Sequence, residues 1–156
     1  MNAVHDARAV PSSLERNMMP VDVHHIPQVA LSFMNDDHHL EACLLNDLVE
    51  VLEQHRGSAA KGVVLERLDA LLVHTREHFA REESAMEESG FPAYPVHKAE
   101  HDRVLDELQA EARGFQEKGD AARLAAYVSK AVPAWFVQHI QSMDLVTSRF
   151  VAARAA

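Results

Sequence analysis

Cysteine is almost absent from this sequence, because Cys43 is the only one among 156 residues. A single cysteine cannot form an intrachain disulfide, and it cannot supply the thiolate cluster that binds soft metal ions. We therefore expect a chain that folds without disulfides in a reducing compartment, the cytoplasm.

Long apolar segments and an excess of basic charge are also missing. No run of about 18 apolar residues occurs, and residues 1–20 lack the apolar region of a secretory signal. The 15 Lys and Arg residues are outnumbered by 24 Asp and Glu, which gives a formal charge of −9. We therefore expect no membrane span and no nucleic-acid partner, since nucleic-acid binding needs a basic patch.

Glycine is scarce, with 5 residues, while Ala, Leu and Glu are plentiful, a composition that favours helix. Apolar residues recur with a period of about 3.6 in four segments. These predict helices over 28–55, 60–88, 93–118 and 121–153. Gly90-Phe91-Pro92 ends the second helix, and Pro133 interrupts the fourth, where we expect a kink.

Short connections between four amphipathic helices favour antiparallel packing of neighbours. The sequence therefore predicts an all-α, up-down-up-down four-helix bundle over residues 28–156. Residues 1–27 contain three prolines and little periodicity, so we predict an extended N-terminal arm there.

Histidine, in contrast, is abundant, with 11 residues. We interpret those in the arm as exposed or packing residues: His5, His24 and His25. His38 and His39 are adjacent in the first predicted helix, so only one of them can face the interior. His38 shares its helix face with apolar residues, and we take it as the inward one.

Two further pairs lie on either side of the Gly/Pro break. His78 precedes Glu82 by four residues, and His97 precedes His101 by four. Positions four apart lie within about 40° of each other on a helix. Each pair can therefore direct two ligating side chains at one point. Glu83 lies about 100° away from Glu82, so we expect it to be solvated.

The inward-facing candidates form a set of five imidazoles and two carboxylates: His38, His78, Glu82, His97, His101, His139 and Asp144. Burying this set would be very costly without cations. Five nitrogen ligands are too many for one tetrahedral zinc ion and too few to saturate two octahedral ions. We predict two metal ions, bridged by Glu82 and Asp144, with one coordination position left open.

Four segments carry a resemblance to a known family: MNDDHH (34–39), HFAREESAM (78–86), GFPAYPVHKAEH (90–101) and WFVQHIQSMD (135–144). From Val21 to about Phe150 the chain resembles the hemerythrin family, most closely the single-domain bacterial hemerythrins. Their pattern is a first-helix His followed by HxxxE, HxxxH and HxxxxD. His139 and Asp144 are about 140° apart on an ideal helix, so their pairing depends on the family pattern and not on spacing.

The resemblance implies a non-haem di-iron centre with an oxo or hydroxo bridge. It implies that His38 and His78 hold the five-coordinate iron that receives O₂, while the other three histidines hold a six-coordinate iron. It also implies an apolar pocket that excludes water. Our candidates for lining this pocket are Phe79, Leu105, Trp135 and Ile140.

We therefore expect a protein that binds O₂ reversibly, for storage, delivery or sensing, and that is not an enzyme. A separate protein would donate electrons or accept the oxygen. The alternative is a di-iron enzyme that acts on peroxide, nitric oxide or ferrous iron, with His74 as a proton relay. His74 can also be an outer hydrogen-bond partner, a packing residue or an extra ligand. A third reading is a metal-free bundle with structural histidines.

Overall fold

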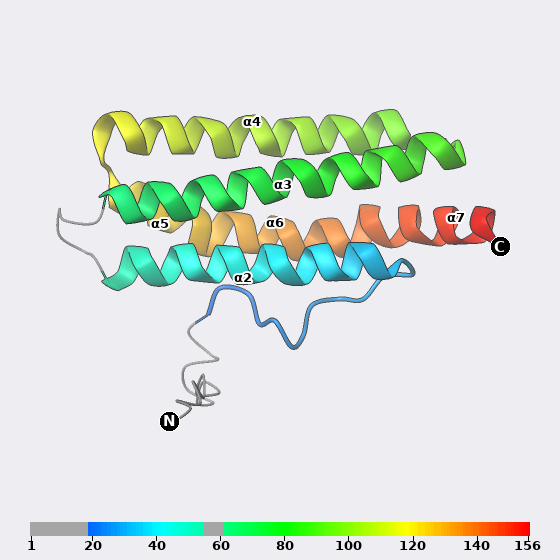
Figure 1. Cartoon of the computed structure of the whole chain (residues 1–156), viewed down its shortest axis with the longest axis horizontal. Coiled ribbons are helices and arrows are strands. Elements are labelled where there is room, and N and C mark those ends of the chain that lie inside the picture. Colours follow the sequence, from blue (N-terminus) through cyan, green and yellow to red (C-terminus); the bar gives the residue numbers. More distant parts are fainter. Residues whose placement is uncertain (1–18, 55–60) are drawn as a thin grey trace, which may run out of the picture.

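Four antiparallel helical rods form the molecule (Figure 1), and the prediction of an all-α four-helix bundle is confirmed. The structure is a computed structural model that describes residues 19–54 and 61–156. The first three rods are α2 (Ser32–Gln54), α3 (Lys61–Ser89) and α4 (Tyr94–Lys118). The predicted end of the first helix at residue 55, His5 and most of the predicted arm lie outside the described residues.

The fourth rod is a composite of five helical pieces. They are α5 (Ala121–Ala126), the π-helical turn η1 (Tyr127–Ala131), α6 (Val132–His139), the π-helical turn η2 (Ile140–Asp144) and α7 (Leu145–Ala155). Pro133 is the second residue of α6, just beyond η1. In that turn the Val132 N–H donates to Tyr127 O, five residues back, so the chain passes the proline in a wider turn. The interruption of the fourth helix predicted near Pro133 is therefore the π-helical turn η1.

Two glycines end helices where the backbone needs a positive φ. Gly90 has φ 68° after α3, and Gly119 has φ 66° after α4, a conformation that side chains with a Cβ disfavour. The Gly119 N–H donates to Phe115 O at 2.8 Å. Asp120 then caps α5 by accepting a hydrogen bond of 3.0 Å from the Arg123 N–H. Such short connections force neighbouring helices to run antiparallel.

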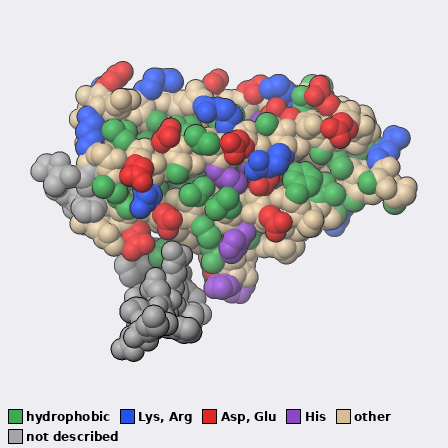
Figure 2. All heavy atoms as spheres, in the orientation of Figure 1, with side chains coloured by type: hydrophobic (Ala, Val, Ile, Leu, Met, Phe, Trp, Pro, Cys, Tyr) green, Lys and Arg blue, Asp and Glu red, His purple; other side chains and the backbone are tan. Residues whose placement is uncertain are grey.

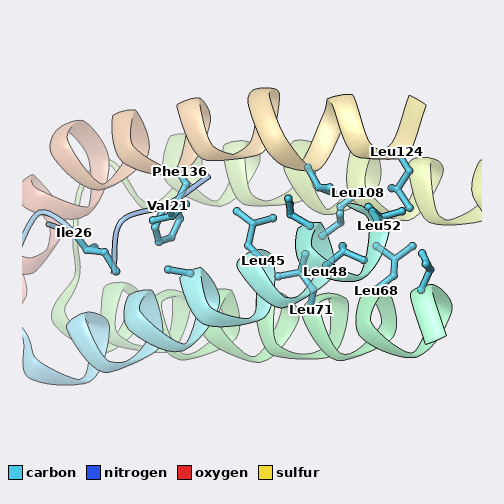
Figure 3. Close-up of a cluster of buried hydrophobic side chains, with 14 of the residues drawn as sticks. Val21, Ile26, Leu45, Leu48, Leu52, Leu68, Leu71, Leu108, Leu124 and Phe136 are labelled. Carbon is cyan, nitrogen blue, oxygen red and sulfur yellow. The ribbon is translucent and has the colours of Figure 1, made fainter. Parts of the chain in front are cut away.

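Leucine side chains fill one half of the bundle, where α2 ends and α3 begins (Figure 3). Each is at most 5% exposed: Leu45, Leu48, Leu52, Leu68, Leu71, Leu108 and Leu124. Burying a leucine side chain fully contributes roughly 1.5–3 kcal/mol, so this half supplies much of the stability. The other half, where α2 begins and α3 ends, holds buried polar side chains together with apolar ones such as Met34 and Met86.

Two asparagines hold the segment that precedes α2. Val21 N–H donates to Asn46 Oδ1 at 3.2 Å, and Asn46 Nδ2 donates to Val21 O at 2.8 Å. Asn35 makes the same pair of bonds with the backbone of Val29, at 2.9 and 3.0 Å. Because these bonds keep the chain extended, α2 begins at Ser32, a few residues after the predicted start at residue 28.

The surface carries charges of both signs. Figure 2 shows acidic and basic side chains interspersed over the face that it displays. One pair joins two rods, because Arg81 of α3 donates two hydrogen bonds, of 2.7 and 2.8 Å, to Asp37 of α2. Within the described ranges, no helix combines the length and the apolar character that crossing a membrane requires.

Candidate metal centre

Seven side chains from all four rods converge in the polar half of the bundle. They are His38 of α2, His78 and Glu82 of α3, His97 and His101 of α4, His139 of α6 and Asp144 of η2. Each is at most 6% exposed. The structure therefore brings together every residue that the sequence analysis named as a candidate ligand, whereas His39 is exposed on the outer face of α2.

Glu82 presents its two oxygens to two different groups of histidines. Its Oε1 lies 2.7 Å from His78 Nε2 and 3.5 Å from His38 Nε2. Its Oε2 lies 3.3 Å from His101 Nε2 and 3.7 Å from His97 Nε2. A carboxylate in this position can bridge two metal ions, one on each side.

Asp144 spans the same two groups. Its Oδ2 lies 3.0 Å from His38 Nε2, while its Oδ1 lies 3.1 Å from both His97 Nε2 and His139 Nε2. These two ring nitrogens are also 3.1 Å apart. An octahedral ion with bonds of about 2.1–2.2 Å holds adjacent donor atoms roughly 3 Å apart, so this spacing suits such an ion.

The π-helical turn η2 explains how His139 and Asp144 reach the same site. An ideal α-helix would place residues five apart about 140° from each other. In η2 the hydrogen bonds close at the fifth residue, as shown by the Leu145 N–H that donates to Ile140 O. Residues five apart therefore lie about one turn apart, on the same side of the rod.

Several polar atoms of the centre are buried without a hydrogen-bond partner among the described residues. They are six atoms: His38 Nδ1 and Nε2, Glu82 Oε2, His101 Nε2, and Asp144 Oδ1 and Oδ2. An unpaired buried polar atom costs about 1–3 kcal/mol. Cations would satisfy the nitrogen lone pairs and carboxylate oxygens aimed at this point, so the donor set fits metal ions.

Protons compete with metal ions for these groups. Burial alone would raise the pKa of Glu82, but the charge of His78 and the neighbouring rings of His101 and His38 hold that pKa well below its usual value. Burial alone would lower the pKa of His78, but Glu82 and Glu41 hold it well above the usual value. Binding of a metal ion must therefore displace a proton from His78.

The ring nitrogens of His101 and His97 that point away from the centre also have hydrogen-bond partners. His101 Nδ1 lies 3.2 Å from Glu83 Oε1, and His97 Nδ1 lies 2.8 Å from Thr147 Oγ1. Glu83, which we expected to be solvated, is half-buried beside α4. A carboxylate only accepts hydrogen bonds, so His101 carries its proton on Nδ1 and directs the Nε2 lone pair inward.

Glu41 is a site residue that the sequence analysis missed. It is 8% exposed, and its Oε2 lies 3.4 Å from His78 Nδ1 and 3.3 Å from His74 Nε2. His74 Nε2 also donates to the backbone Asp37 O at 3.0 Å. One signal could have identified Glu41, because it lies three residues after His38 and so on the same side of α2.

Aromatic rings cover the centre. Phe79 stacks on His101, with 3.8 Å between ring centroids and 2° between planes, and Trp135 stacks on His139 at 4.6 Å and 21°. Phe136, which the sequence analysis did not name, meets His38 edge-on at 5.9 Å.

The four side chains expected to line an apolar pocket are not equivalent. Phe79 and Trp135 lie against histidines of the centre. Ile140 belongs to the apolar core, and Leu105 is only half-buried. The aromatic cover of the site therefore consists of Phe79, Trp135 and Phe136.

Fold and site together define a four-helix-bundle protein with a buried histidine–carboxylate metal centre. The family model described as "Hemerythrin HHE cation binding domain" matches residues 29–148, most of the chain. The chain belongs to the hemerythrin family.

Curated relatives agree with this family. The chain is 37% identical over 120 residues to "Bacteriohemerythrin" of Ralstonia nicotianae, covering 76% of this chain and 80% of the relative. It is 28% identical to "Bacteriohemerythrin" of Aquifex aeolicus, covering 80% of this chain and 92% of the relative. It is 36% identical to "Myohemerythrin" of Sipunculus nudus, over 50% of this chain and 58% of the relative. No solved structure gives a significant match.

Members of this family hold a non-haem di-iron centre, and the buried donor set of this chain fits one. Hemerythrins are di-iron proteins that bind O₂, and this chain is one of them.

Proposed function

We propose that this protein binds O₂ reversibly, for storage, delivery or sensing, and that the seven converging side chains are its iron ligands. His97, His101 and His139 would hold one iron. His38 and His78 would hold the other, and with one histidine fewer this second group would leave room for O₂. The observation that carries this proposal is that Glu82 and Asp144 each present one oxygen to each histidine group.

The protein's own contribution is to hold the ligands and exclude water. The di-iron centre, when bound, supplies the electrons that allow O₂ to bind. Phe136 and Phe79 pack against His38 and His101, and every proposed ligand is at most 6% exposed. An environment of this kind disfavours entry of water, and it therefore favours release of intact O₂ over irreversible oxidation.

We also propose that the protein works in the cytoplasm with a separate partner that donates electrons or accepts the oxygen. The cytoplasmic assignment is supported by Cys43, the single cysteine, which is free in the structure. The partner is proposed because the proposed role includes delivery or sensing.

A second candidate is a di-iron enzyme that acts on peroxide, nitric oxide or ferrous iron. It is favoured by the chain of contacts from His78 through Glu41 to His74, since hydrogen-bonded chains can carry protons. However, both of these contacts use His74 Nε2, whereas a relay through the ring has to leave by the other nitrogen, so they do not by themselves carry a proton beyond His74.

Anaerobic iron loading followed by cycles of O₂ addition and removal tests the proposal. We expect two irons per chain and visible charge-transfer bands that appear with O₂ and vanish on deoxygenation. Bands that persist after deoxygenation would contradict reversible binding. Continued consumption of peroxide or nitric oxide over many turnovers would support the enzyme instead.

His38→Ala and His39→Ala form a matched pair for this assay. The two residues are neighbours on α2, but His38 is fully buried at the centre and His39 is exposed. We expect His38→Ala to lose one iron and the oxygen-dependent bands, and His39→Ala to retain both. Equal behaviour of the two variants would refute the ligand assignment.

A further inference from the structure

A second buried cluster lies on the outer side of His78. It contains Glu41 of α2, 8% exposed, with His74 and Thr75 of α3, 6% and 2% exposed. None of these three residues belongs to the proposed ligand set. A buried carboxylate next to a proposed ligand needs a physical explanation, because burying a charge is costly.

One explanation is a metal site of its own. Ligand atoms of Glu41, His74 and His78 lie within 4.8 Å of one another, which is close enough to hold an ion. The hydrogen bonds argue against it. His74 Nε2 lies 3.0 Å from Asp37 O, and because a carbonyl only accepts, this nitrogen carries a proton and has no lone pair for a metal ion.

This cluster differs from the iron centre in whether its buried polar atoms have hydrogen-bond partners. Among the described residues, the buried atoms that lack a partner all belong to proposed ligands, and none belongs to Glu41, His74 or Thr75. The cluster is therefore complete as a hydrogen-bonded network, whereas the iron centre is complete only with cations.

Side chains of α3 hold the Glu41 carboxylate at both oxygens. Thr75 Oγ1 donates to Oε1 at 2.6 Å, while His78 Nδ1 and His74 Nε2 lie 3.4 and 3.3 Å from Oε2. Since a carboxylate only accepts, His78 carries a proton on Nδ1. By the same rule, His78 Nε2 carries a proton as well, because it lies 2.7 Å from Glu82 Oε1; bound iron would replace this proton, while Nδ1 would keep its own.

We propose that Glu41 is a positioning residue for the iron bound by His78, because its carboxylate fixes the orientation and tautomer of that ring and its negative charge favours the ferric state. A histidine ligand that donates to a carboxylate becomes more basic, and a more electron-rich ligand stabilises the higher oxidation state. This inference rests on the proposed function, since it takes His78 as a ligand.

The proposal gives Glu41 a counterpart on the other side of the centre. Glu83 accepts from His101 Nδ1 at 3.2 Å, so each proposed iron has one histidine with an anionic partner. Glu41 acts on the iron with the open position and Glu83 on the other. Loss of Glu41 should therefore change the properties of one iron and leave the other nearly as it was.

Glu41→Gln and Glu41→Leu test this role in the full-length chain. Gln keeps the shape of the side chain and removes its charge, while Leu also removes the acceptor. The matched control is Glu50→Gln, an exposed carboxylate on the same helix that accepts one hydrogen bond, of 2.9 Å, from Gln54. The readouts are ferrous iron affinity, by competition with a chelator, and midpoint potential, by anaerobic redox titration.

We expect both Glu41 variants to bind one of the two irons 10–100-fold more weakly, with a more positive midpoint potential. Glu50→Gln should match the wild type. If Glu41→Leu does not fold, Glu41→Gln decides the result. Wild-type affinity and potential in Glu41→Gln, with two irons bound, would overturn this inference and leave the proposed function standing.

Two other outcomes have distinct meanings. A wild-type chain that binds fewer than two irons would overturn the proposed function and this inference together. Three metal ions per wild-type chain, reduced to two by His74→Ala, would make Glu41 a ligand and overturn the positioning role alone.

Discussion

Phe136 offers a direct test of water exclusion. Its side chain is 4% exposed, and its ring meets the His38 ring edge-on at 5.9 Å and 89°. The Nδ1 atom of His38 is buried without a hydrogen-bond partner among the described residues. A cavity at this position would therefore offer a polar partner to an entering water molecule, which a purely apolar cavity would not.

Phe136→Ala creates such a cavity, and Phe136→Leu leaves much of the volume filled. A buried Phe→Ala change costs about 3–5 kcal/mol, and a typical domain has a stability of about 5–15 kcal/mol, so the alanine variant should remain largely folded. Replacement by leucine should cost roughly 1.5 kcal/mol or less. For Phe136→Ala we expect oxidation to the form that no longer binds O₂ to accelerate about tenfold, equivalent to about 1.4 kcal/mol in the barrier.

The assay follows the loss of the oxygen-dependent absorption with time, in parallel with thermal unfolding. Leu124→Ala is the control, because Leu124 is 1% exposed and lies in the leucine-filled half of the bundle. It should lower stability without accelerating oxidation. If Leu124→Ala accelerates oxidation as much as Phe136→Ala does, general loosening and not a local barrier is responsible. A wild-type oxidation rate in Phe136→Ala would show that Phe136 does not keep water from the centre.

Three further predictions concern the fourth rod and its neighbour. Asp144→Asn keeps the size of the side chain but removes its charge, so iron analysis should find fewer than two irons per chain; two tightly bound irons would contradict the bridging role. Deletion of the exposed Gln141 removes one residue between His139 and Asp144, so that these two ligands become four residues apart and lie within about 40° of each other on an α-helix. This variant should still bind two irons, and complete loss of iron would show that η2 itself is required. Hydrogen bonds from Arg103 and Trp135 lower the pKa of Glu100 to about 2, so its ionised form contributes stability above pH 4.5 that is lost as the pH falls toward 2. In iron-free protein, the stability difference between wild type and Glu100→Gln should shrink over that range, as measured by urea unfolding at several pH values, and a constant difference would contradict this.

Much of the fold follows from local features of the sequence. Helical periodicity, the Gly90 and Gly119 stops and the Asp120 cap act within a few residues, so they can be recognised without knowledge of tertiary contacts. The start of α2 could not be recognised in this way. The segment before α2 is held by Asn46 bonding to the backbone of Val21, 25 residues earlier, a contact made only after the chain folds back.

The sequence also predicted part of the way in which the candidate ligands come together. His78–Glu82 and His97–His101 were evident because four-residue spacing is a property of a single helix. The pairing of His139 with Asp144 was not, since it needs the π-helical turn η2, which periodicity does not reveal.

Groups that act across helices were missed for the same physical reason. Glu41 reaches His78 from α2 to α3, and Phe136 reaches His38 from α6 to α2. Each looks like an ordinary residue in its own helix. Only the packing of the rods brings these side chains to the centre.

A crystal structure of the iron-loaded protein, with anomalous scattering data collected at the iron edge, tests directly whether the seven side chains hold two irons. We expect two iron peaks per chain, one beside His38 and His78 and the other beside His97, His101 and His139, with Glu82 and Asp144 next to both. A single peak, or a peak located at Glu41 and His74 instead, would contradict this assignment.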